Sequence, residues 1–216
     1  LLKQSDSTGG DVPLHSWLPT FLGVLDERQQ DGSPRDMTAF LEESQAPLKS
    51  TGKKYIVLEN LLHGYSQPNI MDVKLGRVLY DEGASEEKRL RMTDVSESTT
   101  SGSFGFRICG MHLQWNKDCK RMDSRHYERF DNGYVFVNKM YGRDRTGNNI
   151  EDAFNLFFAN DRLSAERTKQ LKEMFLKRIQ LLYNTLLDEE FRMISTSLLF
   201  IYEGDPNRWS KMNDRD

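Results

Sequence analysis

The chain is poor in cysteine and in long apolar runs, and these two shortages exclude several classes of protein. Among its 216 residues only Cys109 and Cys119 are cysteines, too few for a disulfide scaffold and without the partners of a cysteine-based zinc site. The longest apolar run, Leu198–Tyr202, is far shorter than the ~18 residues of a membrane span. The first residues also lack the apolar core of a secretory signal peptide. We therefore expect reduced thiols, no membrane span, and a location in the nucleus and cytoplasm.

Charge of one sign is not in excess either. The chain has 30 Lys and Arg against 33 Asp and Glu, a formal net charge of -3. This balance argues against a chain-wide nucleic-acid footprint, so we expect no direct nucleic-acid binding. What is present, 37% hydrophobic and 11% aromatic residues, suffices for a globular core. The length suits one domain or two small lobes, and the absence of an initiator Met predicts a piece of a longer protein.

Apolar periodicity predicts a mixed α+β fold. Short apolar runs predict strands at 21–25, 55–58, 70–75, 106–114, 134–137 and 195–203, with 55–58 as a buried strand. Helical spacing predicts helices at 84–92, 150–160 and 164–190, with Asn149 and Ser164 capping the last two. The polar segment 26–53 is predicted to be an insertion or mobile loop with one helical turn at 37–43, and 96–105 a loop. A change in composition at residues 59–60 predicts a lobe boundary.

The segment Pro68–Gly76 (PNIMDVKLG) carries the strongest chemical signal. On a strand, Asp72 and Lys74 point to one face, whereas Met71 and Val73 point to the other. A carboxylate and an ammonium placed in this way can serve phosphoryl transfer. Asp72 can accept or orient a hydroxyl proton, and Lys74 can neutralise phosphate charge. A solvated ion pair on an edge strand explains the same spacing, because such pairs are common.

The whole string Pro-x-x-x-Asp-x-Lys-x-Gly resembles the defining motif of the inositol polyphosphate kinase family. Three further segments agree with it: Tyr55–Leu62 (YIVLENLL), Tyr141–Arg143 (YGR) and Ser197–Gly204 (SLLFIYEG). In their order and their amino acids these segments are most similar to the fungal multikinases of that family. The resemblance extends from about residue 13 to residue 209.

This resemblance implies an α+β, two-lobed, protein-kinase-like fold with the ATP cleft between the lobes. Residues 1–60 would form part of the N-lobe, with the hinge at its end, and residues 61–216 the C-lobe. The implied reaction is a Mg²⁺-dependent transfer of the γ-phosphoryl group of ATP to inositol 1,4,5-trisphosphate and tetrakisphosphate, at the 3- and 6-hydroxyls. The family's aspartate element that binds Mg²⁺ has no counterpart after Glu203, so we assign no metal ligand.

The resemblance also implies roles for individual residues. Asp72 corresponds to the motif aspartate, which is either catalytic or a contact to the nucleotide ribose. Lys74 corresponds to the motif lysine, which touches the transferring and the substrate phosphates. Glu59 and Leu61 lie where the family's hinge contacts adenine, through a backbone carbonyl and a backbone N–H.

Basic residues after the motif are implied to bind the inositol phosphate. Lys88 and Arg91 are three residues apart on a predicted helix and so share one of its faces. Arg143 has a guanidinium suited to bidentate phosphate contact. For Lys88 and Arg91 a second explanation stays open, a solvated helix face balanced by Glu86 and Glu87.

A different class of function is also compatible with the sequence. The fold could act as a non-catalytic scaffold that binds transcription factors in nuclear complexes, with the polar segment 26–53 as the contact surface. A protein kinase is disfavoured, because the sequence contains neither a His-Arg-Asp nor an Asp-Phe-Gly motif.

Overall fold

The computed structural model contains two compact units, Leu1–His63 and Gly64–Asp216. The residues that it describes are 12–28, 50–188, 194 and 196–211. The helical turn predicted at 37–43 and most of the predicted insertion lie outside them.

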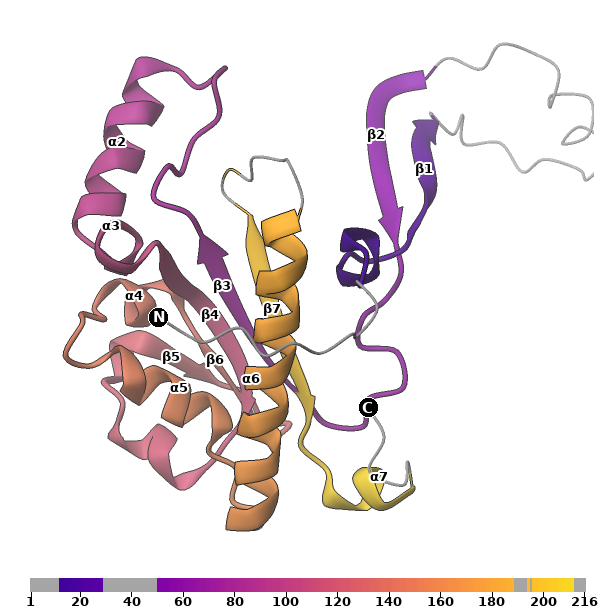
Figure 1. Cartoon of the computed structure of the whole chain (residues 1–216), viewed down its shortest axis with the longest axis vertical. Coiled ribbons are helices and arrows are strands. Elements are labelled where there is room, and N and C mark those ends of the chain that lie inside the picture. Colours follow the sequence, from indigo (N-terminus) through magenta and orange to yellow (C-terminus); the bar gives the residue numbers. More distant parts are fainter. Residues whose placement is uncertain (1–11, 29–49, 189–193, 195, 212–216) are drawn as a thin grey trace, which may run out of the picture. The chain divides into compact units, whose positions relative to one another are not determined.

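The first unit contains a two-stranded antiparallel sheet. The 3₁₀ helix η1 (Leu14–Trp17) precedes β1 (Phe21–Arg28), which pairs with β2 (Ser50–Leu58) (Figure 1). Both ends of the predicted insertion are therefore strand, since β1 runs to Arg28 and β2 starts at Ser50.

The prediction of a buried strand at 55–58 is wrong in one respect. The strand exists, but Ile56 is 71% exposed, and Tyr55 and Leu58 are also exposed. The physical reason is that β2 pairs only with β1 among the described strands, and a two-stranded sheet cannot bury its own faces.

The second unit is built on a five-stranded antiparallel sheet with the strand order β5-β6-β4-β3-β7. Its strands are β3 (Pro68–Leu75), β4 (Phe106–Gln114), β5 (Tyr127–Arg129), β6 (Tyr134–Val137) and β7 (Ser197–Glu203). The motif strand β3 lies between β4 and β7, so Asp72 and Lys74 are on a central strand. This position rules out the explanation that they are a pair on an edge strand.

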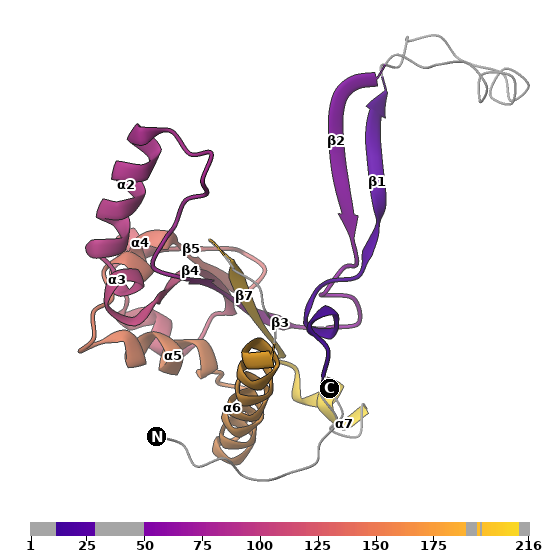
Figure 2. The same cartoon turned by 45° about the horizontal axis from the view of Figure 1, so that its top comes forward.

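The helices of this unit pack against one face of the sheet or lie beyond the ends of its strands. They are α2 (Glu86–Glu97), α3 (Thr100–Phe104), α4 (Lys139–Arg143), α5 (Ile150–Phe158), α6 (Ala165–Asp188) and α7 (Pro206–Lys211), with the 3₁₀ helices η2 (Lys117–Arg121) and η3 (Ser124–His126). Figure 2 shows α5 and α6 on the same side of the sheet. No helix in the described part of the chain is long and apolar enough to cross a membrane.

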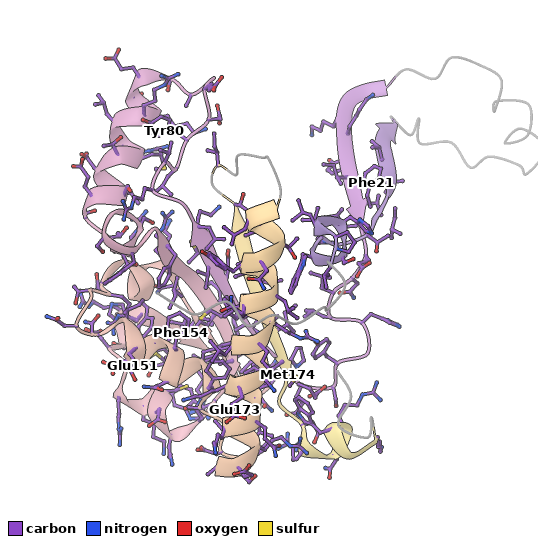
Figure 3. The ribbon with its side chains drawn as sticks, viewed as in Figure 1. Phe21, Tyr80, Glu151, Phe154, Glu173 and Met174 are labelled. Carbon is purple, nitrogen blue, oxygen red and sulfur yellow. The ribbon has the colours of Figure 1, made fainter. Side chains whose placement is uncertain are left out.

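The core of the second unit lies between the sheet and these two helices. Met71 and Val73 of β3 are buried there with Phe157 of α5 and Leu171 of α6. Figure 3 labels residues of both helices that follow this division: Phe154 and Met174 pack against the core, whereas Glu151 and Glu173 are exposed. The apolar spacing therefore predicted the buried face of α5 and of the first half of α6, whereas Ile179 in the second half of α6 is 42% exposed.

The two predicted helix caps have different outcomes. Ser164 caps α6 as predicted, since its Oγ accepts a hydrogen bond from the Arg167 N–H at 3.1 Å. Asn149 occupies the position before α5, but its side chain does not cap that helix. Its Oδ1 accepts from the Thr146 N–H at 2.7 Å, so the side chain closes the preceding turn instead.

The loop predicted at 96–105 is wrong, because α2 continues to Glu97 and α3 follows. Hydroxyl groups satisfy the helix ends there. Ser98 and Thr99 donate to the carbonyls of Asp94 and Val95, both at 2.6 Å. A Ser- and Thr-rich composition is typical of loops, but the same hydroxyls stabilise short helices whose ends they bond.

A close approach fixes α4 against β4. A Cβ atom on Gly142 would overlap the carbonyl oxygen of Ile108 and lie 2.7 Å from its carbonyl carbon. Only glycine allows the two backbones to be this close, which explains the middle residue of the Tyr-Gly-Arg element.

We predict that Gly142→Ala destabilises the protein by roughly 2–4 kcal/mol, because the new methyl group would push α4 away from β4. Urea denaturation would measure this loss. Gly83→Ala is the matched control, since a Cβ there would lie at an ordinary 3.4 Å from the Asp81 carboxylate. An equal effect of both substitutions would contradict the packing explanation.

Candidate functional site

Asp72 and Lys74 point away from the core on the exposed face of β3. Along this strand Asn69, Met71 and Val73 are buried, whereas the residues between them are partly exposed. The predicted alternation is thus present, and the core face determines the direction of both charged side chains.

Other strands contribute side chains to the same face, which we call the outer face. In an antiparallel sheet directly opposite residues point to the same side. The β7 residues opposite Ile70, Asp72 and Lys74 are Ile201, Leu199 and Ser197. The β4 residues opposite them are His112, Gly110 and Arg107. The outer face therefore has an apolar part around Ile70 and a charged part around Lys74.

A β-bulge lies directly beside Asp72. The pairing changes from Asp72 with Gly110 to Val73 with Ile108, which leaves Cys109 as the extra residue. Gly110 has no side chain, so β4 presents only backbone at the position opposite Asp72. In the described structure Asp72 Oδ1 is buried without a hydrogen-bond partner. A buried carboxylate oxygen of this kind suits a hydroxyl group or a cation of a ligand.

The glycine that ends the motif has a conformational role. Gly76 has φ +100°, a conformation that favours glycine, and its N–H donates to the Gly105 carbonyl at 2.7 Å. The glycine thus turns the chain at the end of β3 and joins it to α3.

Lys88 and Arg91 are exposed on α2, where the resemblance expected them. Ser85 caps this helix by accepting from the Lys88 N–H at 3.3 Å. The Lys88 ammonium forms an ion pair with Asp81 at 3.3 Å. The hydrogen bond from Lys88, followed by its charge, lowers the pKa of Asp81. The predicted balance with Glu86 and Glu87 is therefore replaced by a pair with Asp81.

Arg143 is half-buried in the last turn of α4, whose position is set by the contact of Gly142 with Ile108. The helix begins after Asn138, whose Oδ1 accepts from the Met140 N–H at 2.9 Å. The structure thus attaches α4 to β4, the strand next to β3.

Glu59 and Leu61 lie in the first unit, at the end of β2. The Glu59 N–H donates to the Thr20 carbonyl at 3.0 Å, and its carboxylate accepts from the Thr20 N–H at 3.0 Å. A hydrogen bond from the Thr20 side chain to the Glu59 carboxylate, followed by the one from the Thr20 backbone N–H, lowers the pKa of Glu59. The Glu59 N–H is thus bonded within the first unit, and the adenine contact that the resemblance implies for Glu59 and Leu61 stays a prediction.

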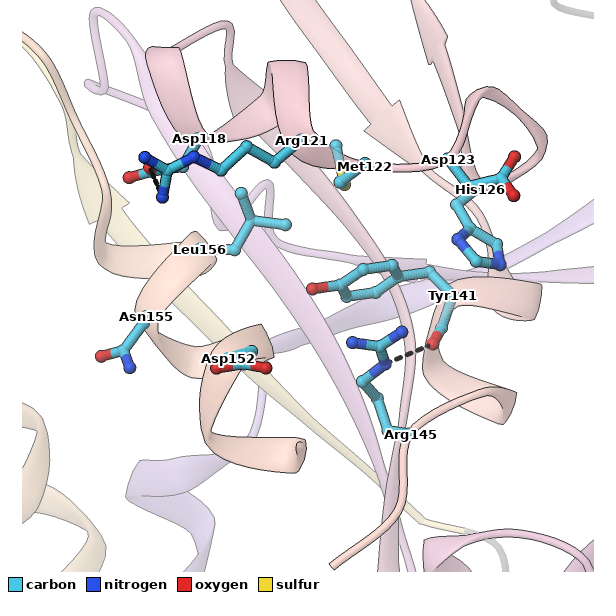
Figure 4. Close-up of a pocket in the computed structure, with 10 residues that line it drawn as sticks. All are labelled: Asp118, Arg121, Met122, Asp123, His126, Tyr141, Arg145, Asp152, Asn155 and Leu156. Atoms are coloured by element: carbon cyan, nitrogen blue, oxygen red, sulfur yellow. Dashed lines mark hydrogen bonds and ion pairs between the residues drawn. The ribbon is translucent and has the colours of Figure 1, made fainter. Parts of the chain in front are cut away.

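Two cavities of the second unit are lined by none of the predicted site residues. The larger, of about 620 Å³, is shown in Figure 4 and lies among η2, η3, α4 and α5. Tyr141 is one of the residues that line it. The Tyr141 carbonyl accepts a hydrogen bond from Arg145 Nε at 3.1 Å, and burial raises the pKa of the Tyr141 hydroxyl. The smaller, of about 370 Å³, lies beside Gln67, Tyr134 and Arg162.

No group of three or more His, Cys, Asp or Glu residues in the described ranges could enclose a metal ion by itself. Mg²⁺ in phosphoryl-transfer sites is commonly held by one or two carboxylates together with substrate phosphates. The unpartnered oxygen of Asp72 fits such a shared arrangement.

Comparison with known proteins identifies the family. Residues 55–216 match the model of the inositol polyphosphate kinase family. The chain therefore belongs to the inositol polyphosphate kinase family, as its motif indicated, and has the mixed α+β fold of that family.

Two multikinases of this family are similar over most of the chain. The inositol polyphosphate multikinase of Saccharomyces cerevisiae is 53% identical over 99% of this chain and 64% of its own length. The multikinase of Schizosaccharomyces pombe is 32% identical over 89% of this chain and 65% of its own length. The chain thus spans slightly less than two thirds of either relative.

A solved structure agrees with this assignment. The crystal structure of an inositol phosphate multikinase from S. cerevisiae, in complex with ADP and Mn²⁺, has a TM-score of 0.81 and 54% identity. The match covers 96% of this chain and 72% of that one. These comparisons give no support to the alternative of a non-catalytic scaffold.

The ion pair of Lys88 generates a prediction about pH. Lys88→Met should return the pKa of Asp81 upward to its ordinary value near 3.8, measured by NMR titration of the carboxyl group. Because the folded pKa is lowered, the pair contributes stability above that ordinary value and loses it as the pH falls through the folded pKa. Arg91→Met is the control and should leave Asp81 unchanged. An unchanged titration of Asp81 in Lys88→Met would refute the pairing.

Proposed function

We propose that this protein is an ATP-dependent inositol polyphosphate kinase. It transfers the γ-phosphoryl group of ATP to ring hydroxyls of inositol 1,4,5-trisphosphate and tetrakisphosphate, at the 3- and 6-positions. The observation that carries this proposal is the outer face of β3, where Asp72 and Lys74 lie side by side on a central strand and Asp72 Oδ1 has no partner in the described structure. The relative solved with ADP and Mn²⁺ supports the choice of a nucleotide as donor.

The order of residues along β3 matches the parts of a nucleotide. Alternate residues of a strand are about 7 Å apart. The apolar surface of Ile70, Leu199 and Ile201 suits a base, the next position on β3 is Asp72, and the one after it is Lys74. In this arrangement Asp72 can contact the ribose or orient the attacking hydroxyl, and Lys74 holds the transferring phosphoryl group.

The remaining residues would select the acceptor. Lys88 and Arg91 of α2 and Arg143 of α4 carry the positive charge that a substrate with several phosphates requires. Residues 61–216 would then be the C-lobe that holds the acceptor, and residues 1–60 part of the N-lobe, with Glu59 and Leu61 offering backbone groups to adenine.

Phosphoryl transfer here forms a bond from the inositol oxygen to the γ-phosphorus and breaks the bond from that phosphorus to ADP. Lys74 stabilises the charge on the moving group, and the hydroxyl proton passes to Asp72 or to solvent. A bound divalent cation, Mg²⁺ or Mn²⁺, would neutralise the phosphate oxygens, with Asp72 as the described residue best placed to help hold it.

The proposal predicts that the natural full-length protein phosphorylates inositol 1,4,5-trisphosphate when ATP and Mg²⁺ are present. Lys74→Ala should lower kcat by about 10³-fold or more without unfolding the protein, because it removes the charge opposite the transferring group. Chromatography of the inositol phosphates measures the products, and circular dichroism measures folding. Lys120→Ala, an exposed lysine of η2, is the control with the same change of charge. Turnover in Lys74→Ala equal to that of the control would overturn the assigned role.

A second substitution separates the two roles of Asp72. If the carboxylate orients the hydroxyl, Asp72→Asn should lower kcat by about 10²–10⁴-fold and leave the KM for ATP near its original value. If it contacts the ribose, the same change should mainly raise the KM for ATP. Steady-state kinetics with ATP as the varied substrate decides between these results. A variant unchanged in both constants would exclude Asp72 from the site.

A further inference from the structure

Arg107 lies on the outer face directly opposite Lys74, a position that the contiguous motif does not include. In the pairing of β3 with β4, Lys74 faces Arg107, whereas the neighbouring pairs are Val73 with Ile108 and Leu75 with Phe106. Ile108 is buried and Phe106 packs against the core, so Arg107 between them points to the outer face. Directly opposite residues have Cβ atoms about 4.5–5.5 Å apart. The two cations are therefore close neighbours.

The hydrogen bonding of Arg107 leaves its charge uncompensated by protein. Its Nη1 donates to the hydroxyl oxygen of Ser101 at 3.0 Å, and Ser101 is fully buried in α3. Among the residues that the structure describes, no carboxylate forms an ion pair with Arg107. A guanidinium has five N–H donors in a planar fork, so one bond to a hydroxyl orients the group and leaves most of its donors for another partner.

Like charges directly opposite each other destabilise a sheet, and an anion bound between them would relieve this repulsion. A phosphoryl group is the partner that fits, because it is anionic and accepts two parallel hydrogen bonds from a guanidinium. We propose that Arg107 and Lys74 together form a two-cation clamp for one phosphoryl group, which belongs either to the nucleotide or to the inositol phosphate. This inference rests on the proposed function and adds a second phosphate-binding residue to it.

The alternative to the clamp is a purely structural role of Arg107, and the experiment must distinguish the two. Through Ser101, Arg107 also joins the sheet to α3 and so to α2, which carries Lys88 and Arg91. If Arg107 served only to anchor α3, removing the hydroxyl of Ser101 would have the same consequence as removing the guanidinium. If it clamps a phosphoryl group, the positive charge on the outer face matters and the anchoring bond matters less.

The test is a set of dissociation constants measured by calorimetry on the natural full-length protein. The ligands are ADP, a non-hydrolysable ATP analogue and inositol 1,4,5-trisphosphate. Arg107→Gln should weaken at least one ligand by about 10- to 100-fold, because a hydrogen-bonded ion pair to phosphate is lost. A loss for the ATP analogue but not ADP assigns the clamp to the γ-phosphate, and a loss for the trisphosphate assigns it to the acceptor.

Three further variants make the result decisive. Arg129→Gln, on β5 with its guanidinium over the Trp115 ring, carries the same charge change away from β3 and should alter no affinity by more than about twofold. Ser101→Ala should weaken binding far less than Arg107→Gln does. If Arg107→Gln does not fold, Arg107→Lys replaces it and should weaken the same ligand by about three- to tenfold, since the bidentate fork is lost.

Two results would overturn the clamp while leaving the proposed function intact. One is unchanged affinity for all three ligands in the Arg107 variants, and the other is an equal loss in Ser101→Ala and Arg107→Gln. If the unaltered protein binds none of the three ligands, the proposed function fails and the clamp fails with it.

Discussion

Two antiparallel ladders hold β3 between β4 and β7, and their register sets the direction of every side chain on that strand. Met71 and Val73 are buried under the sheet, so Asp72 and Lys74 must face outward. A slip of one residue would reverse all four side chains, and burying two charges costs several kcal/mol each. The apolar core of the second unit thus positions the charged groups of the candidate site without contacting a ligand.

Backbone features around β3 complete the site where side chains alone would not. The bulge at Cys109 and the missing side chain of Gly110 leave backbone opposite Asp72. Gly142 lets α4 pack directly on Ile108, which brings Arg143 to the neighbouring strand. Each of these glycines acts through the close approach it permits, so the packing of the sheet also places the charged side chains.

Local sequence patterns predicted much of this arrangement, but they failed where burial or hydrogen bonds from hydroxyl groups determined the structure. The strand at 70–75 and the capped start of α6 at Ser164 are confirmed, because alternation and helix capping act within a few residues. The strand at 55–58 is exposed, since an apolar run does not reveal how many strands will join its sheet. Residues 96–105 are largely helical, because their hydroxyls bond the helix ends instead of forming turns.

The sequence by itself determined the family and the common face of Asp72 and Lys74, because a contiguous motif and a two-residue alternation are local properties of the chain. Only the tertiary structure decided that β3 is a central strand, that Lys88 pairs with Asp81, and that Arg107 lies opposite Lys74. Strand neighbours and registers depend on how the whole sheet packs against α5 and α6. No short segment contains that information, because the pairing residues are far apart along the chain.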